Sequence, residues 1–314
     1  MINRRLLRTK ALQVIYAYHQ TENPSIVKSE KELLFSVDKT YELYYLILVL
    51  LIDVAELAEA RINIRKAKYF PTQEESNPNT KFIENRVLAK IRNSDGFLNY
   101  TEKNKITWVN YPELAKNIYT ALIEKPEYLD YLEGDDTGLR SERAILNYIL
   151  TDLIIPNELF LQILEERSIY WNDDLEFAGT MALKTIEGIK KDQPPKFLPK
   201  YKHEDDREFL IDLLKRTIRN EDEMKDLIQE FAKNWEFERI ALMDVYIMQM
   251  ALTEALYFPS IPTKVTFNEY LEISKYYSTD KSSTFINGIL DKAFSSLKEE
   301  KRIIKTGRGL VGEI

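Results

Sequence analysis

The sequence contains no cysteine and only two histidines, His19 and His203, among its 314 residues. The absence of cysteine excludes a disulfide framework, a catalytic thiolate and any cysteine-ligated metal site. Two histidines are too few for a metal centre built from several imidazoles. We therefore expect no metal and no cofactor.

Residues that break regular structure are also scarce, with 9 glycines and 11 prolines in the whole chain. Hydrophobic residues make up 44% of the sequence and charged residues 30%, which is enough for a sizeable core under a well-solvated surface. No segment of any length alternates apolar and polar residues in the manner of a strand. The sequence therefore predicts an all-α protein.

Long hydrophobic runs are missing. The longest, Leu43 to Ile52, has ten residues, whereas a membrane-spanning helix needs about 20. The opening MINRRLLRTK is charged but is not followed by the apolar region and cleavage site of a secretory signal. We expect a cytoplasmic protein that does not use a membrane as a partner.

Motifs that would indicate catalysis are weak. Adjacent carboxylates occur in a chain with 51 acidic residues, so we interpret them as solvated surface. Gly307, Gly309 and Gly312 fit a dinucleotide-binding string, but they follow a helical segment and open no helix of their own, so the required context is absent. We expect no catalytic residues and no enzymatic activity.

The net charge of −7 argues against a nucleic-acid partner, but the charge is unevenly distributed. The first acidic residue is Glu22, after Arg4, Arg5, Arg8 and Lys10, and a second basic stretch lies near the end of the chain. Exposed charges separated by more than about 8 Å are largely screened at physiological salt. A local basic patch can therefore bind a polyanion despite the acidic total.

Apolar periodicity predicts helices over residues 3–20, 30–68, 81–93, 112–124, 126–133, 140–154, 156–168, 173–190, 205–219, 221–234, 236–257, 264–277 and 282–302. The helix over 30–68 has an apolar centre and a basic end. Three prolines in residues 192–201 predict a stiff linker. Residues 303–314 are expected to form a flexible basic tail.

A faint repeat links the middle and the end of the chain. The segment from Tyr111 matches the segment from Asp206 in its apolar positions, and SERAILNYIL resembles FERIALMDVY. A duplicated helical module would explain this match, but two amphipathic helix pairs also match by chance. The sequence leaves both explanations open for residues 25–204.

Four segments carry a family resemblance. They are RRLLRTKALQVIYAYHQ near the start, DREFLIDLLKRTIRNEDEMKDLI, ERIALMDVYIMQMALTEALY and IPTKVTFNEYLEISKYYSTDKSSTFINGILDK, which ends at Lys292. In this order they resemble the arginine-rich first helix, the next two helices, the core helix and the C-terminal signature of the NusB family of RNA-binding transcription antitermination factors. The last segment is the most specific.

The resemblance implies a discontinuous NusB-type helical bundle, made from residues 1–24 and 205–302. Residues 25–204 would then be a large helical insertion between the first and second helices of the bundle. The chain departs from the family pattern at Leu6 and Leu7, which interrupt the arginine cluster, and at Gln249 and Lys281. These changes bear on the RNA contacts more than on the fold.

The resemblance also implies a set of RNA-binding residues, namely Arg4, Arg5, Arg8, Tyr16, Asp244, Lys281, Thr284 and Phe285. Helix geometry supports part of it, because residues eleven positions apart, such as Arg5 and Tyr16, point within about 20° of each other. Guanidinium groups beside an aromatic ring suit phosphates and stacked bases. The alternatives are a solvated basic face and a Phe285 that packs against the preceding helix.

The expected function is transcription antitermination through binding of single-stranded boxA-type RNA of ribosomal RNA leaders. The resemblance implies joint action with the ribosomal protein NusE and an indirect partnership with the RNA polymerase elongation complex. The alternative is a protein-interaction scaffold in which the acidic insertion dominates and RNA binding is weak or lost. A NusB-like module also begins certain RNA cytosine methyltransferases, but this chain lacks their cysteine and their cofactor domain.

Overall fold

The computed structural model describes residues 1–233 and 237–312. Throughout this part of the chain the regular elements are helices, and one isolated bridge between Ile2 and Tyr201 is the only β-type pairing. The predicted all-α class is therefore confirmed. Residues 234–236, where two predicted helices meet, and 313–314, the end of the predicted tail, lie outside the described residues.

The chain divides into two compact units. The terminal unit consists of Ile2–Val37 and Tyr201–Ile314, and the central unit consists of Asp38–Lys200 together with Met1. The helix α2 (Ile26–Lys66) contributes its first turns to the terminal unit and the remainder to the central unit. The observed division thus falls within a helix, whereas the sequence predicts one after residue 24.

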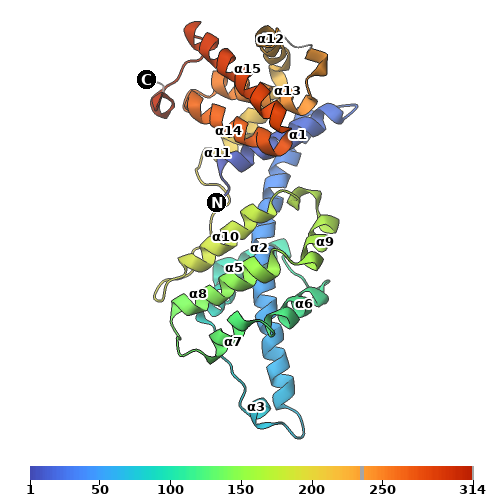
Figure 1. The fold of residues 1–314 in the computed structure, drawn as a ribbon, viewed down its shortest axis with the longest axis vertical. Helices are drawn as coiled ribbons and strands as arrows, with labels where there is room; N and C mark the ends of the chain where they lie inside the picture. Colours follow the sequence, from blue (N-terminus) through green and yellow to red (C-terminus); the bar gives the residue numbers. More distant parts are fainter. Residues whose placement is uncertain (234–236, 313–314) are drawn as a thin grey trace. The chain divides into compact units, whose positions relative to one another are not determined.

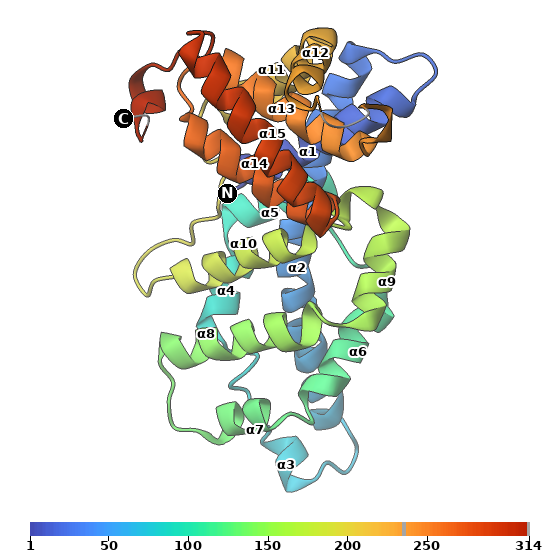
Figure 2. The same ribbon diagram turned by 45° about the horizontal axis from the view of Figure 1, so that its top comes forward.

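The terminal unit contains α1 (Arg4–Gln20), α11 (Asp206–Arg219), α12 (Glu221–Phe231), η3 (Phe237–Arg239), α13 (Leu242–Tyr257), α14 (Thr263–Tyr277), α15 (Asp280–Glu299) and η4 (Gly307–Leu310). Helix α13 contacts α1, α11, α12, α14 and α15, and forms the centre of the bundle (Figures 1 and 2). Its sequence is apolar around the whole helix, and every residue from Asp244 to Ala255 is buried. A helix of this composition is stable only when other helices surround it.

The central unit contains α3 (Gln73–Ser76), α4 (Arg86–Arg92), α5 (Asp95–Asn104), α6 (Pro112–Leu122), α7 (Pro126–Glu133), α8 (Leu139–Tyr148), the π-helical turn η1 (Ile149–Ile154), α9 (Glu158–Arg167), η2 (Ile169–Trp171) and α10 (Leu175–Gly188). The apolar run of α2 is buried in its core. The indole nitrogens of Trp108 and Trp171 donate hydrogen bonds of 2.8 Å to backbone carbonyls of α2. These bonds fix two large side chains against the long helix.

No single helix in the described ranges is long and apolar enough to cross a membrane. One pair, Leu139–Ile154 with Glu158–Arg167, satisfies length and composition but bends by 70° between its halves.

The observed helices differ from the predicted ones at three main places. Helix α5 was not predicted, because its residues include glycine, asparagine and threonine, which are weak helix formers. The predicted helix over 140–154 is α8 followed by η1. Helix α13 begins at Leu242 and not at 236, because Ala241 before it has an extended ψ of 136°.

The C-terminal segment folds back on the end of α13. The Lys305 Nζ donates hydrogen bonds to the carbonyls of Ala255 and Phe258 (2.9 and 3.1 Å), and the Thr306 amide donates one to Pro259 O (3.0 Å). A cation is favourable at a helix C-terminus, where carbonyl groups lack helical partners. Lys305 and Thr306 therefore join the C-terminal segment to the end of α13, and the flexible basic tail over 303–314 stays a prediction.

Candidate RNA-binding surface

Arg8 lies inside the terminal unit. Its guanidinium donates two hydrogen bonds of 2.7 Å to the carboxylate of Glu254 on α13, and only 2% of its side chain is exposed. Burial lowers the pKa of Arg8, but the carboxylate of Glu254 outweighs this effect, so the pKa is raised above its ordinary value. The prediction that Arg8 belongs to an exposed basic face is wrong, because its guanidinium is buried and forms an ion pair with Glu254, which is far away in sequence.

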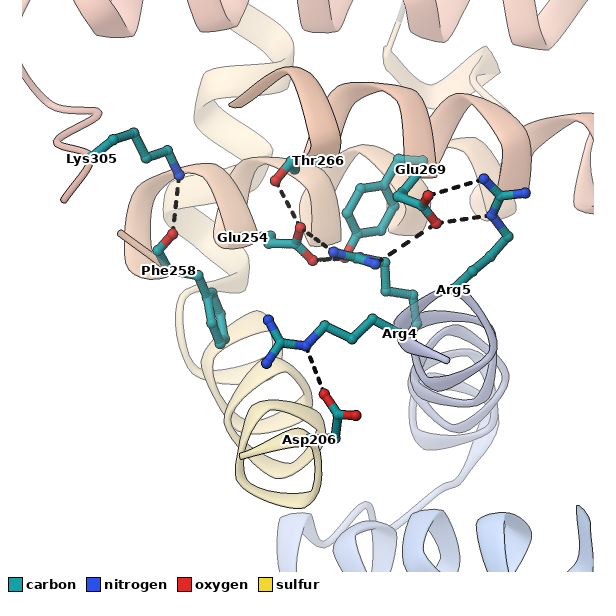
Figure 3. A network of polar contacts seen from close by, with 10 residues as sticks. Arg4, Arg5, Asp206, Glu254, Phe258, Thr266, Glu269 and Lys305 are labelled. Carbon is teal, nitrogen blue, oxygen red and sulfur yellow. Dashed lines mark hydrogen bonds and ion pairs between the residues drawn. The ribbon is translucent and has the colours of Figure 1, made fainter. Parts of the chain in front are cut away.

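Glu254 receives further donors, which complete a buried polar network (Figure 3). The Thr266 hydroxyl donates to it at 2.7 Å and the Tyr270 hydroxyl at 3.3 Å, both from α14. Buried ion pairs are tolerated when such additional hydrogen bonds satisfy the carboxylate. The network fixes α1, α13 and α14 in one arrangement.

Arg4 and Arg5 form ion pairs at the edge of the same network. Arg4 bonds Asp206 and Asp205 at 2.8 and 2.7 Å, and its guanidinium lies 4.7 Å from the centre of the Phe209 ring on α11. Arg5 donates two hydrogen bonds to Glu269 of α14 at 2.9 and 3.0 Å, which Figure 3 shows.

The hydrogen bond to Glu269 is the main cause of the raised pKa of Arg5. Arg5 nevertheless keeps 47% of its side chain exposed. An arginine has five N–H donors, and the bonds to Glu269 use its Nε and Nη2. An anion can therefore approach the remaining edge of this guanidinium.

Tyr16 lies three turns further along α1, about 16 Å from Arg5 along the helix axis at 1.5 Å per residue. Its side chain is 41% exposed, and its ring meets Tyr246 of α13 edge to face at 6.3 Å. His19 stacks on Tyr246 with ring centres 4.9 Å apart and an angle of 9°. Burial lowers the pKa of His19. This aromatic group holds Tyr16 at the surface.

Asp244 is buried at the start of α13 and accepts a hydrogen bond from the Ser278 hydroxyl in the turn between α14 and α15. Asp244 is therefore not exposed, and its role in RNA binding stays a prediction. Thr279 follows this turn and caps α15, because its hydroxyl accepts a hydrogen bond from the Ser282 amide (3.2 Å). Asp244 thus positions the α14–α15 turn.

The first turns of α15 carry the other predicted residues. Lys281 and Thr284 are exposed and Phe285 is half-buried. The Gln13 amide of α1 donates to the Tyr277 hydroxyl at 3.0 Å, so Tyr16's half of α1 is tied to the end of α14. Contact between Tyr16 and Phe285 themselves stays a prediction.

One exposed aromatic residue beside the α14–α15 turn was not predicted from the sequence. Tyr276 precedes the α14–α15 turn and has 81% of its side chain exposed. The neighbouring Tyr277 forms the hydrogen bond to Gln13, so the two tyrosines have different surroundings. The pair in ISKYYST was a usable signal, since only one of two adjacent helical residues can face the core.

The comparisons with known proteins match this part of the chain. A model described as the NusB family matches residues 160–295. Over 146 residues the chain is 35% identical to the transcription antitermination protein NusB of Salinibacter ruber. These residues make up 46% of this chain and 86% of that relative. The chain belongs to the NusB family.

Two further NusB proteins are similar over shorter lengths. The protein from Chloroherpeton thalassium is 42% identical over 105 residues, which cover 33% of this chain and 50% of the relative. The protein from Natranaerobius thermophilus is 36% identical over 94 residues, which cover 30% of this chain and 68% of the relative. No solved structure matches the chain significantly.

NusB membership makes this a transcription antitermination protein of a family without enzymatic activity. The family match runs from α9 in the central unit to α15 in the terminal unit, and α1 lies outside it. The long N-terminal region is therefore additional to the matched residues.

Proposed function

We propose that this NusB-family chain binds single-stranded boxA-type RNA of ribosomal RNA leaders together with the ribosomal protein NusE. Bound in this way, it supports antitermination by the RNA polymerase elongation complex. The observation that carries the proposal is the 35% identity over 86% of a NusB transcription antitermination protein. The exposed cationic and aromatic side chains of the terminal unit suit such a ligand.

The proposed RNA surface combines α1 with the α14–α15 turn. Arg5 and Lys281 provide exposed cations for phosphates, and Tyr16 provides an exposed ring for a base. Thr284 and Phe285 extend this surface along α15, and Arg4 contributes its guanidinium at the edge of α1. Base stacking on an aromatic side chain contributes roughly 1–3 kcal/mol.

Two of the predicted residues act indirectly in this proposal. Arg8 holds α1 in the bundle through Glu254, and Asp244 holds the α14–α15 turn through Ser278. Both therefore position the side chains that meet RNA. Their replacement would weaken binding through a change in structure.

The proposal includes the discontinuous domain. Helix α1 contacts α11, α13 and α14, although about 185 residues of sequence separate it from α11. We take α1 as the first helix of the NusB domain and the central unit as an insertion between its first and second helices. The family match does not reach α1, and its first part, from residue 160, covers α9 and α10 of the central unit.

Fluorescence anisotropy with labelled boxA RNA and a scrambled RNA of equal composition tests the function. The full-length chain should bind boxA RNA at least tenfold more tightly, and NusE should increase that preference. Tyr16→Ala with Lys281→Ala should weaken boxA binding at least tenfold. Lys190→Ala with Lys191→Ala removes two exposed lysines of the central unit and should change it less than twofold.

Salt dependence is measured in the same titrations. For a single-stranded RNA, each substitution that removes a cation bound to a phosphate should reduce the slope of log K against log salt by about 0.7. Equal affinity for boxA and scrambled RNA would exclude the proposed recognition. Absence of RNA binding with retained binding of NusE would favour a protein-interaction scaffold.

A further inference from the structure

The end of α2 and the loop after it form a surface to which neither the fold nor the proposed RNA site assigns a role. Residues 61–70 read RINIRKAKYF, with four basic residues and no acid. Helix α3 and the last turn of α2 extend beyond the other helices of the central unit (Figures 1 and 2). We call residues 61–70 the basic-aromatic tip.

Two aromatic rings at this tip are almost fully exposed. Tyr69 has 91% and Phe70 has 85% of its side chain open to solvent. Their ring centres are 4.7 Å apart and the planes meet at 88°, so each ring packs on the other and leaves most of its surface open. Large exposed apolar groups of this kind mark interaction sites when they cluster.

The basic residues at the tip differ in their surroundings. The Arg61 guanidinium lies over the Tyr119 ring at 5.0 Å, and Lys68 forms an ion pair with Glu75. Arg65 and Lys66 are exposed and form no salt bridge in the described ranges, although the charge of Arg65 helps to lower the pKa of Glu75. The tip is therefore locally positive in a chain whose total charge is −7.

We propose that the basic-aromatic tip is a second contact site for single-stranded RNA. Cations beside open aromatic faces provide the two components of such binding, namely phosphate attraction and base stacking. The inference rests on the proposed function only in taking RNA as the ligand. It concerns a different unit of the chain and different residues.

Charge complementarity favours RNA over a lipid surface as the occupant. An interfacial membrane helix buries a broad apolar face, whereas the exposed apolar side chains here are Ile64, Tyr69 and Phe70. The upstream apolar residues of α2 are already buried in the core of the central unit. The tip therefore offers two rings and several cations, which suit a nucleotide chain.

A 20-nucleotide fluorescein-labelled oligouridylate tests the proposal in the full-length chain carrying Tyr16→Ala and Lys281→Ala, so that the proposed primary site is removed. Adding Tyr69→Ala with Phe70→Ala, or Arg65→Ala with Lys66→Ala, should weaken the remaining binding at least tenfold at low salt. Lys190→Ala with Lys191→Ala is the matched control and should change binding less than twofold. Circular dichroism of each variant confirms the fold.

The results separate this inference from the proposed function. Absence of any boxA preference in the chain without tip substitutions, with oligouridylate binding still dependent on the tip, would reject the proposed function and retain this site. Tip variants that bind oligouridylate within twofold of their parent would overturn the inference. Binding of the same variants to phosphatidylglycerol vesicles is measured as well. Tip-dependent binding to vesicles but not to RNA would also overturn the inference.

Discussion

Replacement of Arg8 by methionine tests the buried network that positions α1. The substitution leaves the Glu254 carboxylate inside the bundle without the two charge-assisted hydrogen bonds of 2.7 Å that it accepts from Arg8. Removing one partner of a buried ion pair typically costs about 3–5 kcal/mol, because the other charge stays buried. We expect a decrease in this range in the stability of the terminal unit.

A double substitution separates the ion pair from packing. Glu254→Gln keeps one carbonyl oxygen that can accept from the Thr266 hydroxyl, and its amide NH2 can donate to the Tyr270 hydroxyl, which bonds the other oxygen of Glu254. In the chain with both Arg8→Met and Glu254→Gln no charge is left unpaired, so the decrease should fall to about 1–2 kcal/mol. The coupling between the two sites should therefore be about 2 kcal/mol or more.

Hydrogen exchange measured by mass spectrometry reports the loss of stability separately for the terminal unit and the central unit. Since 1.4 kcal/mol corresponds to a factor of ten, a decrease of about 3 kcal/mol should speed exchange of the protected α1 and α13 amides about a hundredfold. Peptides from α8 and α10 in the central unit are the internal control. An Arg8→Met chain that exchanges within fivefold of the wild type, or a double variant as destabilised as the sum of the singles, would refute the reasoning.

Three further predictions concern stability. Burial, followed by the charge of Glu56, raises the pKa of Asp53 from 3.8 to about 7. The folded chain then keeps a proton that the unfolded chain releases, so the free energy of unfolding should fall between pH 4 and 7 by on the order of 4 kcal/mol, at about 1.4 kcal/mol per pKa unit. Urea unfolding of Asp53→Asn should lack this decline. In Gly309→Ala the new Cβ would lie 1.9 Å from Pro259 O, so the amides at the C-terminal end of α13 should exchange faster. In Gly288→Ala the new Cβ meets nothing within 4 Å, so this control should stabilise α15 by about 1 kcal/mol in thermal unfolding. Asp244→Ala should cost about 1–3 kcal/mol, because it leaves Ser278 without its acceptor, and exchange in the α14–α15 turn measures this. Equal pH slopes, equal glycine effects or an unchanged turn would contradict the respective arguments.

Local patterns were sufficient for most of the helices and insufficient for the partners of charged side chains. The apolar stripe of α1 and the prolines that begin α6 and α7 are visible in a few residues of sequence, and these helices are close to their predicted ranges. From the same local sequence, Arg8 is predicted to lie on the surface. Its partner Glu254 lies 246 residues away, so only the tertiary structure shows that the pair is buried.

The same limit applies to Asp244 and to the boundary between the units. An acid near the start of a helix is ordinarily favourable and exposed, and nothing near Asp244 in sequence indicates that Ser278 covers it. The resemblance places a boundary after residue 24, which stays a prediction, and α2 continues from Ile26 through residue 37 without a break. Helix continuity depends on packing that a single break signal does not report.

Ultraviolet crosslinking of a short boxA RNA to the full-length chain, followed by mass spectrometry of the crosslinked peptides, tests the central claim most directly. The account predicts crosslinks in peptides that contain Tyr16 on α1 and residues 281–285 on α15, and their disappearance with scrambled RNA. Crosslinks confined to the central unit, or none in either of these segments, would contradict it.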